Sequence, residues 1–494
     1  MTMRRTTRRA AAVTAVAMTL LTAPGALAQP AGDDSPSSSA PSSTTKKAPN
    51  SQPPALDKGA RPAVGAASPD VDYKQHLSCI TSSTGNQKIA EKPWGQMQLR
   101  LEEAHRFATG KGIKLAVIDT GVNGKQPRLE GRVQAGGDYV GKNEGNGAVD
   151  CDGHGTEVAG VAAAGRDPET GFVGAAPEAQ ILAYRQTSAH YKFDDPAKQD
   201  SRPTAGKVGT LARAIVKAAE DGADVINISL TACETPNPNG SSAQEKQLQA
   251  AIDWAVNTKD AVIVTAAGNL VASDPNSKSS GCASQNDNAD PETVKVVASP
   301  PWYADDVLSV ASMSQQGGVS SFSVWGPWVS VAAPGEDIVT LDPAGSGLTN
   351  ATVDQNGQAA RIQGTSFAAP YVAGVVAMVR ERFPELNAHQ VMDRIKSTAQ
   401  HPGNPGGSDH KVGAGMVNPI AALTAELPLE QAGAKPENPE QIFTDLNNGA
   451  PPSRTPMIVA LAGTGIGVGA LLLTLFVVHT VGRNRERKPV KSAF

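Results

Sequence analysis

The chain has 494 residues, a formal net charge of −4 and 19% charged residues. A charge balance this close to neutral offers no basic surplus to hold nucleic acid, so we expect no nucleic-acid partner. Only 4% of the residues are aromatic, whereas 49 are glycine and 36 are proline. This composition fits an α/β protein with long loops.

The first 28 residues have the pattern of a secretory signal. Four arginines between positions 4 and 9 precede an apolar stretch, Ala10–Ala23, that is too short to span a membrane stably. Ala26-Leu27-Ala28 is a small-x-small cleavage site, so the mature chain is predicted to begin near Gln29. A twin-arginine signal is the alternative, but the surrounding pattern fits it poorly.

Two segments are predicted between the signal and the main domain. Residues 29–70 are rich in Ser, Pro, Ala and Gly, and bury too little apolar surface to offset their ordering entropy, which predicts disorder. Residues 71–92 are expected to wrap around the main domain as an N-terminal extension. The main domain is predicted over residues 93–426, a length that can bury a full core. Its opening helix is expected to include Trp94 and Leu99–Phe107.

Two motifs follow in the first half of this domain. Leu115–Ile118 is a short apolar run that predicts a buried strand, and Asp119-Thr120-Gly121 stands at its carboxyl end. Reactive and ligand-binding groups collect at this end of strands in open α/β sheets. His154-Gly155-Thr156 then precedes a helical pattern over Glu157–Ala164.

Two further motifs lie in the second half. Ala261–Asn269 reads as a strand followed by a turn of small residues. Gly364–Pro370, with the sequence GTSFAAP, opens an apolar run over Tyr371–Val379 that predicts a helix. Pro370 is expected in the first helical turn, where a missing N–H costs little. Ser366 would then lie in the positive field of a helix N-terminus.

Asp119, His154 and Ser366 together carry the groups of a catalytic triad. A serine hydroxyl is a poor nucleophile until an imidazole takes its proton, and a carboxylate must hold that imidazole in the right tautomer. The Asn269 amide and the Ser366 backbone N–H are the candidate donors to an oxyanion. A chance match would not produce all four groups in this order, and a pseudoenzyme that keeps the fold without activity is the more serious alternative.

These motifs resemble those of the subtilisin-like serine proteases, whose triad has the same chain order. The resemblance covers residues 90–422 and includes Val225–Leu230, Val331–Gly335 and Gly413–Asn418. It implies an α/β fold with a mainly parallel sheet and helices on both faces, and peptide-bond hydrolysis through an acyl-enzyme. It also implies that Ser229 and Leu230 line the substrate cleft. The Ser-Leu-Gly pattern of the family is broken here by Thr231, which leaves the shape of the specificity pocket open.

Four cysteines are predicted to form two disulfides, because an exported protein meets an oxidising environment. Four cysteines allow three pairings, of which we favour Cys79–Cys151 and Cys233–Cys282. The first would tie the N-terminal extension to the loop before His154. The second would join two loops that follow adjacent strands. No close Cys or His spacing predicts a zinc site, and no cofactor is expected.

Three acidic residues and two insertions are also noted near the motifs. Asp152 could bind a metal or tune His154, although a solvated carboxylate is the simpler interpretation, and Asp138 and Asp150 lack the ligand density that predicts calcium. Gln186–Lys207 is interpreted as a surface insertion. Asp342–Gln363 is a Gly- and Asn-rich loop expected near the cleft.

The C-terminal end predicts a membrane anchor. Residues 427–456 are polar and Pro-rich, which is typical of a tether. Met457–Val481 is apolar with His479 as its one titratable residue, and its length suits a transmembrane helix. Residues 482–494 are basic, so this tail is expected in the cytoplasm and the main domain outside the cell membrane.

This arrangement and three segments, 116–122, 226–231 and 364–370, are similar to the mycosins, membrane-anchored subtilisin-like proteases of mycobacteria and related actinobacteria. The resemblance implies partners in the type VII (ESX) secretion membrane complex and limited processing of exported protein or peptide substrates. We therefore expect an anchored serine endopeptidase. The alternatives are a structural subunit with little proteolysis and a general cell-surface protease.

Overall fold

The computed structural model describes residues 65–81, 88–141, 146–193, 204–237, 241–270, 282–286, 294–353, 359–430 and 455–485, with residues 53, 56 and 62. All of them belong to one of two compact units, residues 48–494. The predicted signal, most of the predicted disordered segment and tether, and the end of the basic tail lie outside the described residues.

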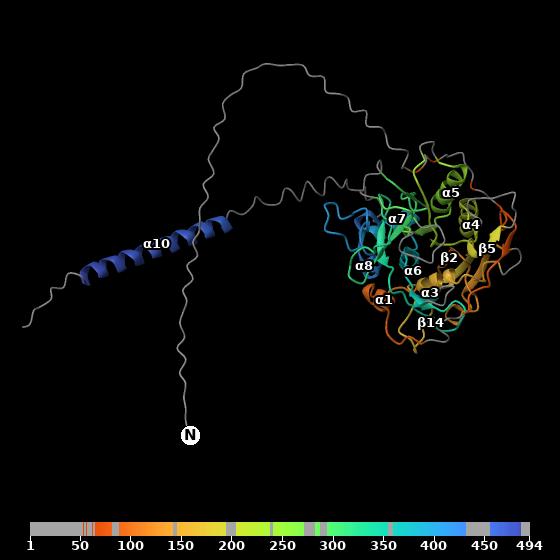
Figure 1. The fold of residues 1–494 in the computed structure, drawn as a ribbon, viewed down its shortest axis with the longest axis horizontal. Coiled ribbons are helices and arrows are strands. Elements are labelled where there is room, and N and C mark those ends of the chain that lie inside the picture. Colours follow the sequence, from red (N-terminus) through yellow and green to blue (C-terminus); the bar gives the residue numbers. More distant parts are fainter. Residues whose placement is uncertain are drawn as a thin grey trace, which may run out of the picture. The chain divides into compact units, whose positions relative to one another are not determined.

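A parallel sheet forms the core of the described chain, with seven strands in the order β12-β11-β9-β7-β2-β4-β3 (Figure 1). Every pairing in it is parallel. The strands are β2 (Lys114–Asp119), β3 (Val133–Asp138), β4 (Gln180–Arg185), β7 (Val225–Ile228), β9 (Val262–Ala266), β11 (Leu308–Met313) and β12 (Val331–Pro334). The α/β fold and the mainly parallel sheet predicted from the sequence are confirmed.

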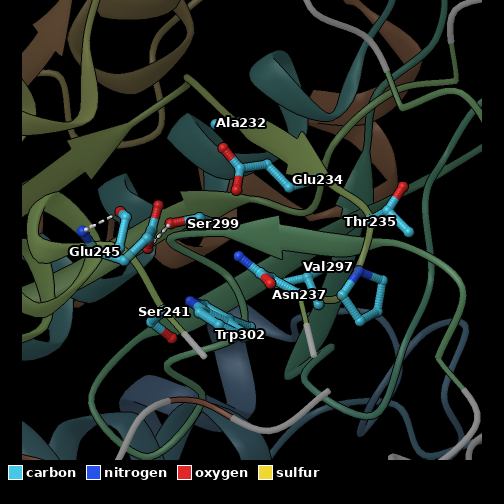
Figure 2. Close-up of a pocket in the computed structure, with 11 residues that line it drawn as sticks. Ala232, Glu234, Thr235, Asn237, Ser241, Glu245, Val297, Ser299 and Trp302 are labelled. Carbon is cyan, nitrogen blue, oxygen red and sulfur yellow. Dashed lines mark hydrogen bonds between the residues drawn. The ribbon is translucent and has the colours of Figure 1, made fainter. Parts of the chain in front are cut away.

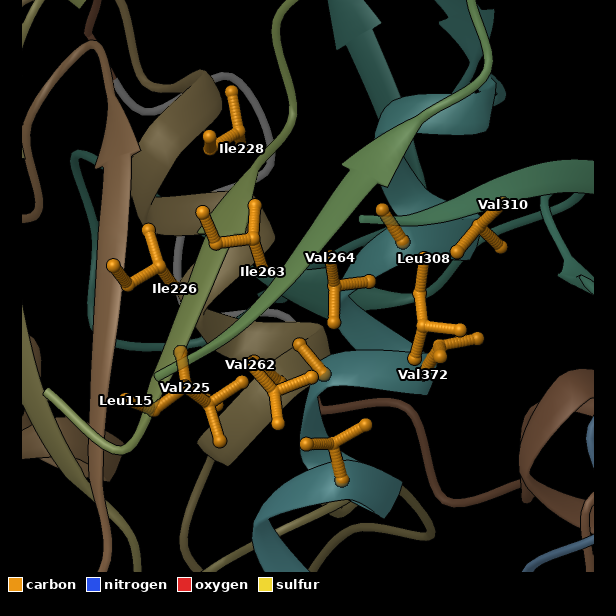
Figure 3. Packing of buried hydrophobic residues seen from close by; sticks show 14 of the residues in the cluster. Leu115, Val225, Ile226, Ile228, Val262, Ile263, Val264, Leu308, Val310 and Val372 are labelled. Carbon is orange, nitrogen blue, oxygen red and sulfur yellow. The ribbon is translucent and has the colours of Figure 1, made fainter. Parts of the chain in front are cut away.

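Helices cover this sheet. Every residue of β7, β9 and β11 is buried, as expected for a parallel sheet with both faces covered. Helices α3 (His154–Ala163) and α6 (Thr365–Arg382) pack against each other and against the central strands. Helices α4 (Val208–Glu220) and α5 (Ala243–Asp253) form a second packed pair, and a π-helical turn, η3 (Trp254–Thr258), extends α5. Figure 3 shows Val372 of α6 beside Leu308 of β11.

The opening helix is not continuous, in contrast to the prediction over Leu99–Phe107. It is split into α1 (Trp94–Gln98) and α2 (Leu101–Ala104). Arg100 separates them with a left-handed φ of 52°, a conformation that an α-helix does not accommodate. Leu99 and Leu101 are both buried, so tertiary packing of these two side chains accompanies the break.

Three α-helices and a 3-10 helix, η6 (Pro428–Glu430), follow α6 in the described chain. Helix α7 (Ala388–Ser397) begins at a capping box formed by Asn387 and Gln390, and α8 (Pro419–Thr424) is capped by the Asn418 side chain. Helix α10 (Thr455–Arg485) contains the predicted span Met457–Val481. Among the described residues, no helix combines the length and the apolar character needed to cross a membrane. The membrane span therefore stays a prediction.

The segment after β4 is a strand pair, not the simple surface insertion predicted for Gln186–Lys207. Strand β5 (Ser188–Phe193) pairs with β6 (Thr204–Ala205) and, on its other side, with β1 (Tyr73–Gln75) of the N-terminal extension. This small sheet has its own apolar contact, formed by the buried residues Tyr73, Tyr191 and Ala205. The polar residues around them in the sequence gave no apolar pattern from which these strands could be predicted. The remaining short strands are β8 (Ala232–Glu234) with β10 (Val297–Ser299), β13 (Thr340–Leu341) with β14 (Leu348–Thr349), and β15 (Ala351–Val353) with β16 (Ala359–Arg361).

A buried ion pair fixes the carboxyl ends of β3 and β4. Asp138 Oδ2 accepts hydrogen bonds from Nε and Nη2 of Arg185 at 2.9 and 2.6 Å, and both side chains are at most 3% exposed. Asp138 Oδ1 accepts from the backbone N–H groups of Val140 and Gly141. In the sheet register Arg185 stands between Asp138 and Asp119. This pair therefore holds the strand beside the one that carries Asp119.

Replacing Asp138 by Ala is expected to lower the free energy of unfolding by about 3–5 kcal/mol, because it removes a buried carboxylate that accepts two hydrogen bonds from Arg185. Urea denaturation of the purified protein measures this change. The matched control is Asp393→Ala, which breaks an exposed pair with Lys396 on α7 and should change stability by less than about 0.5 kcal/mol. Equal effects of the two variants would contradict the prediction.

Candidate active site

The three residues of the predicted triad lie on three neighbouring elements. Asp119 ends β2, His154 is the first residue of α3, and Ser366 is the second residue of α6. Helices α3 and α6 contact each other, and both contact β2. The His154 ring lies 5.4 Å from the ring of Phe367, the residue after Ser366. The fold thus brings together side chains that are up to 247 positions apart in the printed sequence.

Asp119 and His154 are hydrogen-bonded. The Asp119 carboxylate is fully buried, and its Oδ1 lies 2.7 Å from Nδ1 of His154. The same oxygen accepts from the Thr120 backbone N–H at 2.7 Å. Because Nδ1 is engaged by the carboxylate, Nε2 is the nitrogen left to exchange a proton with another group. Among the described residues no hydrogen bond joins this imidazole to the Ser366 hydroxyl, a contact that often tightens only with bound substrate.

The environment of His154 favours its protonated form. Burial opposes protonation of the imidazole, but the charge and the hydrogen bond of Asp119 outweigh that effect and raise the pKa of His154 to about 9. The side chain is 31% exposed, so it is reachable from solvent. A base of this kind takes a proton more readily than a free imidazole does, and it is neutral only in alkaline solution.

Asp150 links the segment after Asp119 to the segment around His154, a role that no pattern in the sequence indicated. Its Oδ1 accepts from the Thr120 hydroxyl at 2.9 Å and from the Gly153 N–H at 2.7 Å. Its Oδ2 accepts from the N–H and the hydroxyl of Thr156 at 2.8 and 2.6 Å. Burial raises the pKa of Asp150 to about 6 in spite of these bonds. One carboxylate therefore links the residue after Asp119 to the first turn of α3.

Glu157 is a second acidic group near the imidazole. It lies one turn after His154 on α3 and is 6% exposed. Burial raises the pKa of Glu157 to about 8, and the charge of His154 only partly opposes this effect. Glu157 is therefore mainly neutral at pH 7, whereas Asp119 is the carboxylate that is hydrogen-bonded to His154.

Pro370 is not in the first helical turn, in contrast to the prediction. Helix α6 begins at Thr365, so Pro370 is its sixth residue and lies inside the helix. A proline there has no N–H to give to the carbonyl four residues earlier, which is that of Ser366. The Ser229 hydroxyl donates to this carbonyl instead, at 2.7 Å. The side chain of the first residue after β7 thus replaces the missing helical bond.

Asn269 is held with its amide nitrogen directed to the same helix end. Its Oδ1 accepts from both the N–H and the hydroxyl of Thr365 at 3.0 Å, and the Thr365 hydroxyl accepts from the Gly268 N–H at 3.2 Å. The acceptor atom of the amide is thereby occupied, so Nδ2 is left to donate. A Cβ on Gly364 would lie 3.4 Å from this Nδ2, and the φ of 150° at Gly364 also favours glycine.

The segment predicted to bind substrate lies beside these groups. Ser229 is 3% exposed, and its hydroxyl donates a hydrogen bond to the Ser366 carbonyl. Thr231, which breaks the family pattern, donates its hydroxyl to the Ala266 carbonyl at the end of β9. A pocket borders the continuation of this segment, where Glu245 accepts from the Ser299 hydroxyl (Figure 2). It is lined by Ala232, Glu234, Thr235, Pro236, Asn237, Ser241, Ser242, Glu245, Val297, Ser299 and Trp302. The substrate-binding role of Ser229 and Leu230 stays a prediction.

Two disulfides join the predicted pairs, Cys79–Cys151 and Cys233–Cys282. Cys151 lies in the loop before His154, and the Ile80 N–H donates to the Cys151 carbonyl at 3.0 Å. The N-terminal extension is therefore bonded to the loop that positions the imidazole. Asp152 ties the same loop to β5, because it accepts from the Ser188 hydroxyl and the Ala189 N–H. Asp152 is thus not the solvated carboxylate expected from the sequence.

A comparison with known families agrees with this geometry. The model of the Subtilase family matches residues 110–415, a range that contains Asp119, His154, Asn269 and Ser366. The chain belongs to the subtilase family of serine endopeptidases. It is therefore a hydrolase of peptide bonds.

Within that family the chain is similar to the mycosins. Mycosin-1 of Mycolicibacterium smegmatis is 42% identical over 441 residues, which cover 85% of this chain and 92% of that protein. The crystal structure of MycP1 from the ESX-1 type VII secretion system is 41% identical, with a TM-score of 0.68 and coverage of 78% of this chain and 98% of that one. A chain in the structure of an intact ESX-5 inner membrane complex is 36% identical, with a TM-score of 0.68 and coverage of 87% and 100%.

The raised pKa of His154 predicts an alkaline activity profile. The neutral imidazole is the form that accepts a proton, so the reaction rate should rise with pH and reach half of its maximum near pH 9, where His154 titrates. The rate of covalent labelling by a fluorophosphonate, measured between pH 6 and 10, gives this profile. A rate that is already maximal at pH 7 would contradict the prediction.

Proposed function

We propose that the chain cleaves peptide bonds with Asp119, His154 and Ser366 as its catalytic triad. The observation that carries this proposal is the 2.7 Å bond between Asp119 Oδ1 and His154 Nδ1, next to a serine at the start of α6. The buried carboxylate fixes the tautomer in which Nε2 is free to accept a proton. The subtilase match over all three residues supports the same assignment.

In this mechanism His154 takes the hydroxyl proton as the Ser366 oxygen attacks the scissile carbonyl. The imidazolium that forms is stabilised by Asp119 and then gives its proton to the leaving amine. Water, activated by the same imidazole, hydrolyses the acyl-enzyme and restores the serine. The raised pKa of His154 reflects an environment that already favours its charged form, which is the form present in the transition state.

The oxyanion of each tetrahedral intermediate is proposed to bind Asn269 Nδ2 and the Ser366 N–H. Thr365 supports this role, because two of its groups occupy Oδ1 of Asn269 and so orient the opposite amide nitrogen. The Ser366 N–H belongs to the first turn of α6, where backbone donors have no helical partner. In subtilisin, loss of the corresponding amide costs about 10²–10³-fold in kcat.

Ser366→Ala is expected to abolish covalent labelling by a fluorophosphonate, since no nucleophilic oxygen remains to displace fluoride. Labelling of the purified protein is measured by mass spectrometry, which also locates the modified residue. Thr398→Val, a buried change at the C-cap of α7, 32 positions after Ser366, is the control and should label at the unaltered rate. Labelling that persists in Ser366→Ala would exclude Ser366 as the nucleophile.

We further propose that the protease domain is held outside the cell membrane by Met457–Val481, with a cytoplasmic tail. The apolar composition of this segment and the basic residues after it support the anchor. Similarity to a chain of the ESX-5 inner membrane complex supports type VII secretion components as partners. Exported proteins are the proposed substrates, because a peptidase held outside the cell membrane meets proteins that have crossed it. The same similarity favours a structural role in that assembly as a second function, which does not require the triad.

Deleting residues 457–481 is expected to release the protein from the membrane fraction, because the anchor carries the proposed attachment. Ser366→Ala should stay membrane-bound, since it alters no apolar surface in that segment. Sedimentation after alkaline carbonate extraction measures both. Retention of the deleted protein in the membrane pellet would refute the anchor, and normal secretion in Ser366→Ala cells would favour the structural role.

A further inference from the structure

The nucleophile of this protein lies in a helical turn that lacks one of its own hydrogen bonds. In an α-helix each carbonyl accepts from the N–H four residues later. For the Ser366 carbonyl that residue is Pro370, which has no N–H, although α6 continues to Arg382. A buried carbonyl without a partner costs free energy, so a donor from elsewhere in the fold is needed.

Ser229 supplies that donor with a defined direction. Its hydroxyl donates to the Ser366 carbonyl at 2.7 Å and accepts from Asn227 Nδ2 at 3.0 Å. Because the Asn227 amide occupies a lone pair of the Ser229 oxygen, the hydroxyl hydrogen is directed to the carbonyl. Asn227 is fully buried in β7, between β2 and β9. A chain of two hydrogen bonds therefore runs from the centre of the sheet to the peptide group of the nucleophile.

We propose that Ser229 is a positioning residue for Ser366: its hydroxyl replaces the helical N–H that Pro370 removes and so sets the orientation of the nucleophile. The inference rests on the proposed triad. Loss of this bond frees the peptide plane that begins at Ser366, and with it the direction of the Ser366 side chain and of the adjacent N–H groups. A displacement of about 1 Å in such a group costs on the order of 10²-fold in rate.

The same bond connects the nucleophile to the segment that follows β7. Ser229 is the first residue after that strand, and Leu230 and Thr231 continue from it toward the pocket of Figure 2. Thr231 is bonded in turn to the Ala266 carbonyl, three residues before Asn269. A helical N–H at position 370 would bond the Ser366 carbonyl within α6 alone. With proline at position 370, the hydrogen bond to the Ser366 carbonyl comes from the residue after β7 and not from α6 itself.

A double-mutant cycle on the full-length protein tests this inference, with Ser229→Ala, Pro370→Ala and the combination of both. The readout is the second-order rate of fluorophosphonate labelling, in which the Ser366 oxygen bonds to phosphorus, fluoride leaves and His154 takes the proton. Ser229→Ala is expected to lower this rate at least about tenfold. In the Pro370→Ala background, the alanine that replaces the proline donates its N–H to the Ser366 carbonyl, so adding Ser229→Ala should change the rate less than about twofold.

Thr398→Val is the matched control, because the Thr398 hydroxyl is also buried and also donates to a helix carbonyl, that of Arg394 at 2.8 Å. Thr398→Val should shift the urea midpoint by about as much as Ser229→Ala does. Its labelling rate should stay near that of the unaltered protein, whereas the rate of Ser229→Ala should fall. A Ser229→Ala protein that labels at the unaltered rate overturns the inference. An equal loss in both backgrounds also overturns it, since the carbonyl bond is then not the cause.

Two remaining outcomes are decisive as well. If Ser229→Ala alone does not fold, recovery of folding and labelling in the double variant supports the inference, and failure of both overturns it. If the unaltered protein does not label at all, the proposed triad fails and this inference fails with it. Labelling of the unaltered protein, lost in Ser366→Ala but unchanged in Ser229→Ala, leaves the proposed function standing and removes only the role of Ser229.

Discussion

The parallel register of β2, β7 and β9 is the constraint on which the site depends. Because these strands run in the same direction, their carboxyl ends reach one edge of the sheet, and the residues that follow them lie close together. Asp119 ends β2, Ser229 follows β7, and Asn269 lies just beyond β9. An antiparallel neighbour would send one of these residues to the opposite edge. The strand order therefore decides which polar groups can share one reaction centre.

Helix N-termini complete the site at that edge. His154 is the first residue of α3 and Ser366 the second of α6, so both stand where backbone N–H groups have no helical acceptor. Such an end favours negative charge, which suits the carboxylates Asp119 and Asp150 beside α3 and the oxyanion proposed beside α6. Burial raises the pKa of Asp150 to about 6 and that of Glu157 to about 8, so proton binding near His154 extends over several pH units.

The surroundings of the site replace regular secondary structure with specific side-chain bonds. Pro370 interrupts the hydrogen-bond ladder of α6 at Ser366, the proposed nucleophile, and Ser229, the residue after β7, donates the missing bond. Asp150 joins the turn after β2 to the first turn of α3, and the Cys79–Cys151 disulfide ties the N-terminal extension to the same loop. Each of these bonds joins residues of different helices, strands or loops. The geometry of the site therefore depends on the folded domain as a whole.

The features that depend on a local sequence pattern could be predicted from the residues alone. Apolar runs predicted β2 and β9, and the order of Asp119, His154 and Ser366 predicted the chemistry, because strand burial and residue type are visible in short windows. The two disulfide pairs were also predicted correctly. Other features became visible only in the folded chain. They are the break at Arg100, the strands within residues 186–207, the position of Pro370 inside α6 and the contacts of Asp150 and Ser229. These features depend on hydrogen bonds and packing between residues that are far apart in the chain. Such contacts form only when the folded sheet brings those residues together, so no short stretch of sequence indicates them.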